Sequence, residues 1–237
     1  MEAASEYSIL QAWKQSPDAA VIVVDMQPDF YPDGALPVTG GDELVALIPE
    51  LIAGFETIVF TQDSHPVPHI SFASSYPSKK PFEILSLEEV QSGLLKSQFS
   101  TAEVETYLQK TAGHTQILWP DHCVQGTNGG ELDSRLPLAE AHLILRKGTK
   151  SLVDSYSAFF ENDGSETGLS GFLKSRGVTK LVVCGLAGDY CVLWTAEDAK
   201  REGFQVLVSE LWTRFVDFPA GSRAAAISEF KKLNSPS

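Results

Sequence analysis

Cysteine and positive charge are both scarce in this 237-residue sequence. It has three cysteines, Cys123, Cys184 and Cys191, and an odd, sparse set of thiols is not a disulfide framework. We therefore expect a reducing compartment, with the cytoplasm as the predicted location. Lysine and arginine total 18 against 31 acidic residues, a formal net charge of −13. This balance argues against a general affinity for nucleic acid or for anionic membranes.

Long apolar runs are missing as well. The longest, around residues 21–24 and 181–183, have the length of a strand, whereas about 20 apolar residues are needed to span a bilayer. The N-terminus has no basic stretch followed by an apolar core, so a secretory signal is not expected. With 43% hydrophobic and 21% charged residues, the chain can bury a sizeable core. We expect one domain over residues 1–237.

Six short β-branched runs divide the sequence. They are nearly continuous in apolar residues, as strands buried on both faces of a parallel sheet are, and cover residues 20–24, 57–60, 115–118, 142–145, 180–183 and 205–208. Helical spacing lies between and after them, at residues 42–55, 166–176 (with Gly177 as a C-terminal cap), 191–202 and 222–233. The predicted fold is therefore α/β, a three-layer α/β/α sandwich with a mainly parallel, six-stranded Rossmann-like sheet.

Residues 67–114 form a long segment between the second and third predicted strands. Ser86 has the pattern of a helix start, and residues 100–109 that of a second short helix. We interpret the segment as an insertion within the domain, because it contains too few apolar residues to fill a core of its own. About the first 17 residues are expected to form a peripheral helix.

Chemically reactive side chains follow the predicted strands. They are Asp25, Asp63, His65, His122 and Lys147 after the first four strands, and Cys191 after the turn that follows the fifth. Each has an ordinary explanation when taken alone: an aspartate after a strand is commonly a turn cap, and a cysteine that opens a helix is more often a small buried hydrophobe. Ligands bind beyond the carboxyl ends of the strands in doubly wound sheets, so the joint placement indicates a site.

Three of these residues have the side-chain types that commonly bind a metal ion. Asp63 and His65 are two positions apart on an extended segment and therefore face the same side. With His122 they provide two nitrogens and one oxygen, a set that suits Zn²⁺ and leaves positions open for water or substrate. The alternative is that both histidines are structural loop residues. His69 is a fourth ligand or a residue that supports a ligand from behind, and we favour the supporting role.

Cys191 has the expected surroundings of a nucleophile. It lies at the predicted start of a helix, where free N–H groups and the helix dipole favour the thiolate. Asp25 could accept the thiol proton, and Lys147 could keep that carboxylate ionised and offset developing charge. Cys184, inside an apolar strand, and Cys123 are interpreted as structural.

Several stretches together carry a family resemblance, namely residues 22–30, 61–66, 71–74, 119–127, 146–148, 154–159 and 184–192. They resemble the isochorismatase-like cysteine hydrolases, and within that family the nicotinamidase/pyrazinamidase type. The resemblance covers about residues 19–218. Its specific motifs are the loop at 119–127 and the segment Asp-Tyr-Cys-Val at 189–192. The pairing of that loop with Asp-x-His indicates the nicotinamidase type, because relatives that act on other amides or on vinyl ethers generally lack this metal set.

The resemblance implies a role for each matching residue. Cys191 would be the nucleophile, Asp25 its proton acceptor and Lys147 the third member of a catalytic triad. The backbone N–H groups of Ala187 and Cys191 would form the oxyanion hole, with a cis peptide bond between Leu186 and Ala187.

The same resemblance implies the ligands of a cofactor and of a substrate. One divalent metal ion, with zinc as the expected metal, would be bound by Asp63, His65 and His122. Aromatic walls that hold a flat pyridine ring would come from Phe30, Trp119 and Tyr156. Three positions depart from the family pattern: Pro28 replaces asparagine, Ser64 an aromatic residue and Gly188 a threonine. Gly188 is nearest to the reacting groups, and we expect it to loosen the oxyanion turn.

The implied activity is that of a metal-dependent cysteine amidohydrolase, which deaminates nicotinamide to nicotinate and ammonia in NAD salvage through a thioester acyl-enzyme. The expected partners are a small-molecule substrate, nicotinamide or pyrazinamide, and further copies of the chain in a homo-oligomer, without nucleic acid or membrane. Three alternatives remain. They are a related amidohydrolase acting on a ureido, carbamoyl or other small amide, a non-catalytic scaffold on this fold, and metal-only hydrolysis with a structural Cys191.

Overall fold

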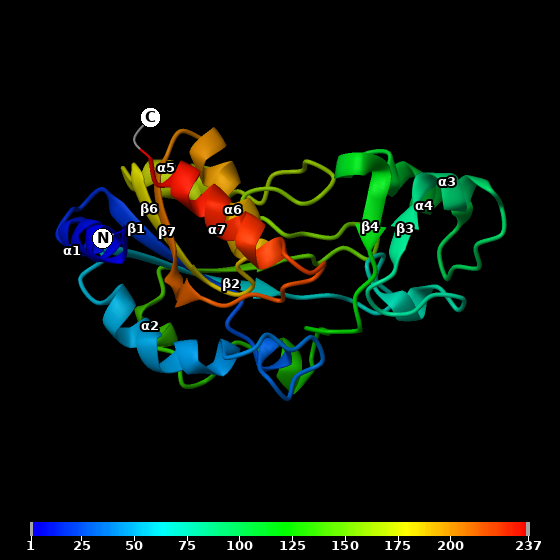
Figure 1. The fold of residues 1–237 in the computed structure, drawn as a ribbon, viewed down its shortest axis with the longest axis horizontal. Helices are drawn as coiled ribbons and strands as arrows, with labels where there is room; N and C mark the ends of the chain where they lie inside the picture. The colour runs from blue at the N-terminus through cyan, green and yellow to red at the C-terminus, as the bar shows by residue number, and fades with distance from the viewer. Residues whose placement is uncertain (1, 236–237) are drawn as a thin grey trace.

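Five parallel strands form the main sheet of the protein, whose computed structural model describes residues 2–235. Their order is β5-β2-β1-β6-β7 (Figure 1). The strands are β1 (Ala19–Val24), β2 (Thr57–Asp63), β5 (Leu143–Lys147), β6 (Lys180–Gly185) and β7 (Gln205–Thr213). Because all five run in the same direction, their carboxyl ends meet at one edge of the sheet.

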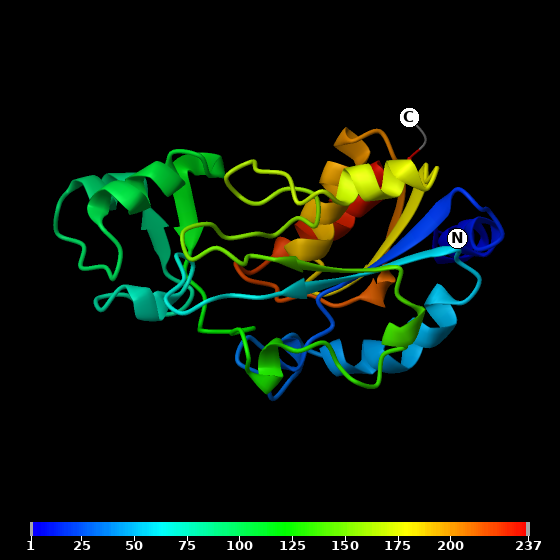
Figure 2. The ribbon, with the colours of Figure 1, turned by 180° about the vertical axis from the view of Figure 1, so that it is seen from behind.

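Helices cover both faces of this sheet (Figures 1 and 2). Alternate residues of β1 face opposite layers: Val21 and Val23 belong to one hydrophobic cluster, Ala20 and Ile22 to another. The first cluster packs against α1 (Glu2–Trp13) and α2 (Leu44–Ile52), and the second against α5 (Leu169–Ser175), α6 (Cys191–Arg201) and α7 (Ser222–Leu233). The predicted three-layer α/β/α sandwich is confirmed.

The prediction of six strands in the main sheet is wrong by one. Residues 115–118 contribute β4 (Thr115–Ile117), which pairs antiparallel with β3 (Ile84–Ser86) in a separate two-stranded sheet. In β4 the middle residue, Gln116, is buried, whereas Thr115 is exposed. A strand exposed on one side does not satisfy the requirement of a central parallel strand, which is buried on both faces.

Residues 67–118, which we call the lobe, project beyond the carboxyl end of β2 (Figure 1). Besides β3 and β4 the lobe contains α3 (Leu87–Gln91) and α4 (Thr101–Leu108). The expectation that residues 67–114 lack the apolar residues for a core is wrong. A third hydrophobic cluster consists of Ile70, Ala73, Tyr76, Leu85, Val90, Val104, Tyr107, Leu108 and Leu118.

Helix starts and ends agree with the local sequence. Ser86 caps α3, where its hydroxyl accepts from the N–H of Glu89 at 3.2 Å, and Ser100 and Glu103 form a capping box at α4. Gly177 follows α5 with φ +72°, as expected of a C-terminal cap. Of the predicted N-terminal helix, α1 covers residues 2–13, and Met1 lies outside the described residues. Within residues 2–235, none of the helices has the length and apolarity that crossing a membrane requires.

Candidate active site

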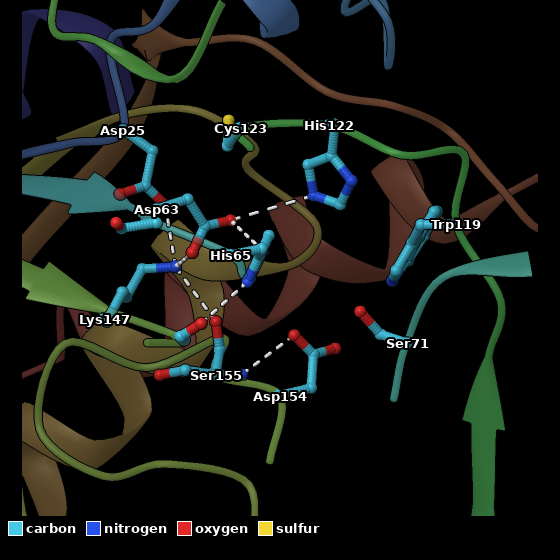
Figure 3. Close-up of polar contacts among 12 residues, drawn as sticks. Asp25, Asp63, His65, Ser71, Trp119, His122, Cys123, Lys147, Asp154 and Ser155 are labelled. Carbon is cyan, nitrogen blue, oxygen red and sulfur yellow. Dashed lines mark hydrogen bonds and ion pairs between the residues drawn. The ribbon is translucent and has the colours of Figure 1, made fainter. Parts of the chain in front are cut away.

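The predicted reactive residues meet at the carboxyl edge of the main sheet, and Figure 3 shows Asp25, Asp63 and Lys147 among them. Asp25 follows β1, Asp63 ends β2, Lys147 ends β5 and Cys191 begins α6. All four side chains are buried. The strand order explains their meeting, because β5, β2, β1 and β6 are neighbours in the sheet although they are far apart in the sequence.

Lys147 is the centre of this group. Its Nζ lies 2.9 Å from Asp25 Oδ2, 2.6 Å from Asp63 Oδ1 and 3.4 Å from Cys191 Sγ. It also donates to the backbone oxygen of Ser155 at 2.9 Å. Burial opposes the charge of this lysine, but the two carboxylates together raise its pKa well above the ordinary value. The site therefore holds a permanent positive charge beside a thiol.

The thiol and its predicted proton acceptor lie within reach of each other. Ligand atoms of Asp25, Asp63 and Cys191 lie within 4.8 Å of one another, and Thr61 Oγ1 donates to Asp25 Oδ1 at 2.6 Å. Burial raises the pKa of the Cys191 thiol, and the positive charge of Lys147 opposes this shift. Burial also raises the pKa of Asp25. The resting thiol therefore keeps its proton beside a carboxylate whose raised pKa suits it to accept one.

Two histidines and Asp63 form a second group next to Lys147. The distance from Asp63 Oδ2 to His65 Nε2 is 3.3 Å, and to His122 Nε2 it is 3.8 Å. Figure 3 shows both imidazoles directed at this carboxylate. The backbone brings them together: the N–H of His65 donates to the carbonyl oxygen of Cys123 at 3.0 Å, which holds the loop that carries His122 beside the end of β2.

The hydrogen bonds of the two histidines fit metal binding. Nδ1 of His65 lies 3.0 Å from the carbonyl oxygen of Gly148, and Nδ1 of His122 lies 2.8 Å from that of Pro120. A carbonyl only accepts, so each Nδ1 carries a proton, and Nε2 is the nitrogen of each ring that can bind a cation. The three ligand atoms lie within 4.8 Å of one another. This donor set fits one divalent metal ion with open coordination positions.

Protonation of the histidines supports the same conclusion. Burial and the neighbouring His65 lower the pKa of His122 to about 4, so its imidazole is neutral at pH 7. Burial would also lower the pKa of His65, but Asp63 outweighs it and raises that pKa. Next to Asp63, His65 thus binds either a proton or another cation.

His69 does not join the ligand atoms around Asp63. Its ring packs against His65 with 4.2 Å between centroids. Its nitrogens have other partners: Nδ1 lies 2.8 Å from Ser71 Oγ, and Nε2 lies 3.2 Å from the carbonyl oxygen of Val153. His69 therefore contacts the predicted ligand His65 through its ring, and its supporting role stays a prediction.

A cavity opens onto both groups, with about 360 Å³ of space between atoms, part of it open to solvent. The predicted aromatic residues Phe30, Trp119 and Tyr156 line it, as do Asp63, His122, Ala187 and Cys191. Four further lining residues were not predicted, namely Leu36, Asp154, Tyr190 and Val216. Asp154 and Tyr190 lie inside the quoted motifs, so motif position was the available signal for them. Leu36 and Val216 carry no chemical signal in the sequence.

Gln27 and Gln116, also not predicted, hold the site in place. The side chain of Gln27 pairs with the backbone of Asp63, donating to its carbonyl oxygen and accepting from its N–H, both at 2.8 Å. Gln116, in the lobe, donates to Asp154 Oδ2 at 3.0 Å and to Tyr156 Oη at 3.3 Å. Tyr156 Oη also accepts from Trp119 Nε1 at 3.0 Å. One amide from the lobe thus connects three residues of the cavity wall.

The predicted oxyanion turn has the expected backbone. The peptide bond between Leu186 and Ala187 is cis, and Cys191 is the first residue of α6, so its N–H precedes the first intrahelical hydrogen bond. The expectation that Gly188 loosens this turn is wrong. A Cβ at Gly188 would lie 2.4 Å from the ring of Phe215, and the N–H of Gly188 donates to the carbonyl oxygen of Arg214 at 2.7 Å. Phe215 fills the space that a larger side chain would need.

Comparison with known proteins agrees with this geometry. Residues 19–211 match the isochorismatase domain. A nicotinamidase of Acinetobacter baylyi is 43% identical over 196 residues, which cover 82% of this chain and 80% of the relative. The solved structure of a nicotinamidase/pyrazinamidase from Acinetobacter baumanii is 38% identical, with a TM-score of 0.78 over 93% of this chain and 95% of that one.

A third relative is a pyrazinamidase of Pyrococcus horikoshii, solved in complex with zinc. It is 32% identical, with a TM-score of 0.64 over 92% of this chain and 97% of that chain. Nicotinamidases and pyrazinamidases are hydrolases that act on amides, and the match to the family domain extends from β1 into β7. The chain therefore belongs to the isochorismatase family and is a hydrolase acting on an amide.

Proposed function

We propose that this protein hydrolyses nicotinamide to nicotinate and ammonia, as a step of NAD salvage, with Cys191 as the nucleophile. The observation that carries the proposal is the position of Lys147 Nζ, in contact with Cys191 and with both Asp25 and Asp63. The names of the relatives supply the substrate class, since they are nicotinamidases and pyrazinamidases. The aromatic walls of the cavity suit a flat heteroaromatic ring.

Proton transfer starts the reaction at Cys191. Asp25 takes the thiol proton while the sulfur attacks the carboxamide carbon, and the carbonyl π-bond electrons move to oxygen. The N–H groups of Ala187 and Cys191 stabilise this oxyanion, an interaction worth about 3 kcal/mol for each donor. Lys147 offsets the negative charge that leaves Asp25 and develops on the sulfur of Cys191 as the proton is transferred.

Collapse of the tetrahedral intermediate releases ammonia. The C–N bond breaks, Asp25 returns its proton to the leaving nitrogen, and a thioester on Cys191 remains. A water molecule then gives a proton to Asp25 and attacks the thioester carbon. The C–S bond breaks, nicotinate forms and the thiol regains its proton.

Asp63, His65 and His122 would hold one divalent metal ion, and zinc is our proposal because a related pyrazinamidase binds it. When bound, such an ion supplies a Lewis acid that binds and polarises a ring nitrogen. Phe30, Trp119 and Tyr156 hold the ring flat, so that its carboxamide lies over Cys191. Lys147 shares Asp63 with the metal group and so connects the two parts of the site.

An ammonia-release assay tests the proposed function. We expect turnover of nicotinamide and of pyrazinamide, no turnover of a ureido substrate, loss of activity with a chelator and recovery when zinc is added back. Turnover of the ureido substrate alone would support the related amidohydrolase, and no ammonia from any of them would support a scaffold. Activity that survives full alkylation of Cys191 would support metal-only hydrolysis.

A further inference from the structure

Two aromatic side chains from distant parts of the sequence meet outside the cavity. Phe82 belongs to the lobe, in the turn before β3, and Phe218 lies between β7 and α7. Their ring centroids are 4.9 Å apart at an interplanar angle of 57°. The contact therefore joins the lobe to the segment that follows the main sheet.

This pair rests on two residues that line the cavity. The ring of Phe82 meets Trp119 edge-on, with 5.9 Å between centroids, and Trp119 in turn meets Tyr190 edge-on at 4.9 Å. Tyr190 donates its hydroxyl proton to the carbonyl oxygen of Phe218. Trp119 and Tyr190 line the cavity, whereas Phe82 and Phe218 do not. The latter pair is thus an outer layer over the cavity wall.

The Phe218 side of the contact is held firmly. The carboxylate of Asp189, two residues before the nucleophile, accepts from the N–H of Val216 at 3.0 Å and from that of Asp217 at 2.8 Å. It also accepts from the hydroxyl of Ser222 at 2.5 Å. Any movement of Phe218 would therefore disturb the turn that carries Cys191.

The Phe82 side is the more exposed one. Phe82 is 37% exposed, and its N–H donates to the carbonyl oxygen of Leu118 at 2.6 Å. Its φ of +71° is a left-handed conformation that a bulky residue rarely adopts. Such a conformation persists where surrounding contacts impose it, and here the contacts are Trp119, Phe218 and the Leu118 carbonyl.

We infer that Phe82 and Phe218 form an aromatic gate that limits the size of the amide admitted to Cys191. The pair acts as a specificity determinant for the proposed function, on which this inference rests. Trp119 and Tyr190 line the cavity that holds the substrate ring, and the gate excludes ring substituents that extend past these two residues. Because Phe218 is tied to the catalytic turn, we expect Phe82 to be the ring that yields.

Substrate size tests the gate. We would measure kcat/KM for nicotinamide and for nicotinamides with ring alkyl groups of increasing length, in wild type, Phe82→Ala, Phe218→Ala and Phe82→Tyr. Phe82→Ala should raise kcat/KM for the alkylated substrates relative to nicotinamide by about tenfold, the range that one or two methylenes of space control. Phe82→Tyr retains the ring and should keep wild-type selectivity. Leu94→Ala is the control, since this lobe residue is 85% exposed.

Thiol labelling separates the gate from the proposed function. Phe82→Ala should raise the rate at which N-phenylmaleimide labels Cys191 relative to iodoacetamide, because the larger reagent needs the wider entrance. Cys123 and Cys184 are fully buried, so their labelling gives the background rate. A shifted labelling ratio without nicotinamide turnover refutes the proposed function and leaves the gate standing. Nicotinamide turnover with unchanged substrate and labelling ratios, in folded Phe82→Ala and Phe218→Ala, refutes the gate.

Discussion

The active site has a charged region, which we call the floor, and an aromatic region, which we call the wall, and different interactions hold the two in place. The floor lies at the carboxyl edge of the main sheet and consists of buried charges, with Lys147 between Asp25 and Asp63. The wall consists of aromatic rings such as Trp119 and Tyr156, and Gln116 of the lobe supports it through a neutral hydrogen bond to Tyr156. The comparison shows that the sheet supplies the reacting groups, whereas aromatic side chains supported by the lobe shape the space for the substrate.

The energies involved differ as much as the chemistry does. A buried charge that loses its partner destabilises a protein by about 3–5 kcal/mol, whereas a typical neutral hydrogen bond contributes about 1 kcal/mol. The floor should therefore be intolerant of any change in charge. The wall should tolerate single changes and respond through substrate affinity.

Lys147→Met should have the largest effect of the substitutions that test this difference. It leaves Asp25 and Asp63 buried without their cation, so we expect a loss of about 3–5 kcal/mol in the free energy of unfolding. We also expect kcat to fall at least about a hundredfold, because nothing then offsets the negative charge that develops on Cys191 when Asp25 takes its proton. Denaturant unfolding and ammonia release measure the two effects.

Lys174→Met is the matched control for this substitution. Lys174 pairs with Glu202 at 2.8 Å, but its side chain is 53% exposed, and such surface pairs contribute at most about 1 kcal/mol. If the two variants lost equal stability, the account of a charge-dependent floor would be wrong.

Gln116→Leu should have a smaller and different effect. The substitution removes the donor to Asp154 and Tyr156 and leaves the wall less well oriented. We expect KM to rise about fivefold, equivalent to about 1 kcal/mol, while kcat stays within about threefold of wild type. Steady-state kinetics with nicotinamide separate these parameters.

Gln98→Leu is the control for the wall, because this exposed residue of the same lobe donates to the carbonyl oxygen of Ser74 at 3.0 Å. It should leave both parameters unchanged. A fall in kcat for Gln116→Leu as deep as that for Lys147→Met would remove the distinction between floor and wall.

The same distinction explains what could be predicted from sequence. The main sheet was predictable because buried parallel strands are continuous apolar runs, and the charged residues that follow them, such as Asp25 and Lys147, are conspicuous there. The run at residues 115–118 resembles a strand of the main sheet in its length and in its β-branched residues Thr115 and Ile117. Its pairing with β3 and its burial on one side place it in the lobe.

The residues that hold the wall could not be predicted for a different reason. Gln116 acts through hydrogen bonds to Asp154 and Tyr156, about 40 positions further along the chain. A glutamine in a short strand has no pattern that distinguishes this role from solvent exposure. Phe82 and Phe218 likewise meet only after the lobe has packed beside the β7–α7 segment. Such contacts depend on tertiary structure and leave no local periodicity.

The central claim is that Cys191 carries the acyl group during turnover. Acid quenching of the enzyme during hydrolysis of nicotinamide, followed by peptide mass spectrometry, tests it most directly. The account predicts a nicotinoyl group on the peptide that contains Cys191, absent from Cys191→Ala, which should bind nicotinamide but lose ammonia release by at least about a thousandfold. Cys184→Ala should retain the adduct. Wild-type turnover by Cys191→Ala, with no nicotinoyl peptide in either enzyme, would contradict the account.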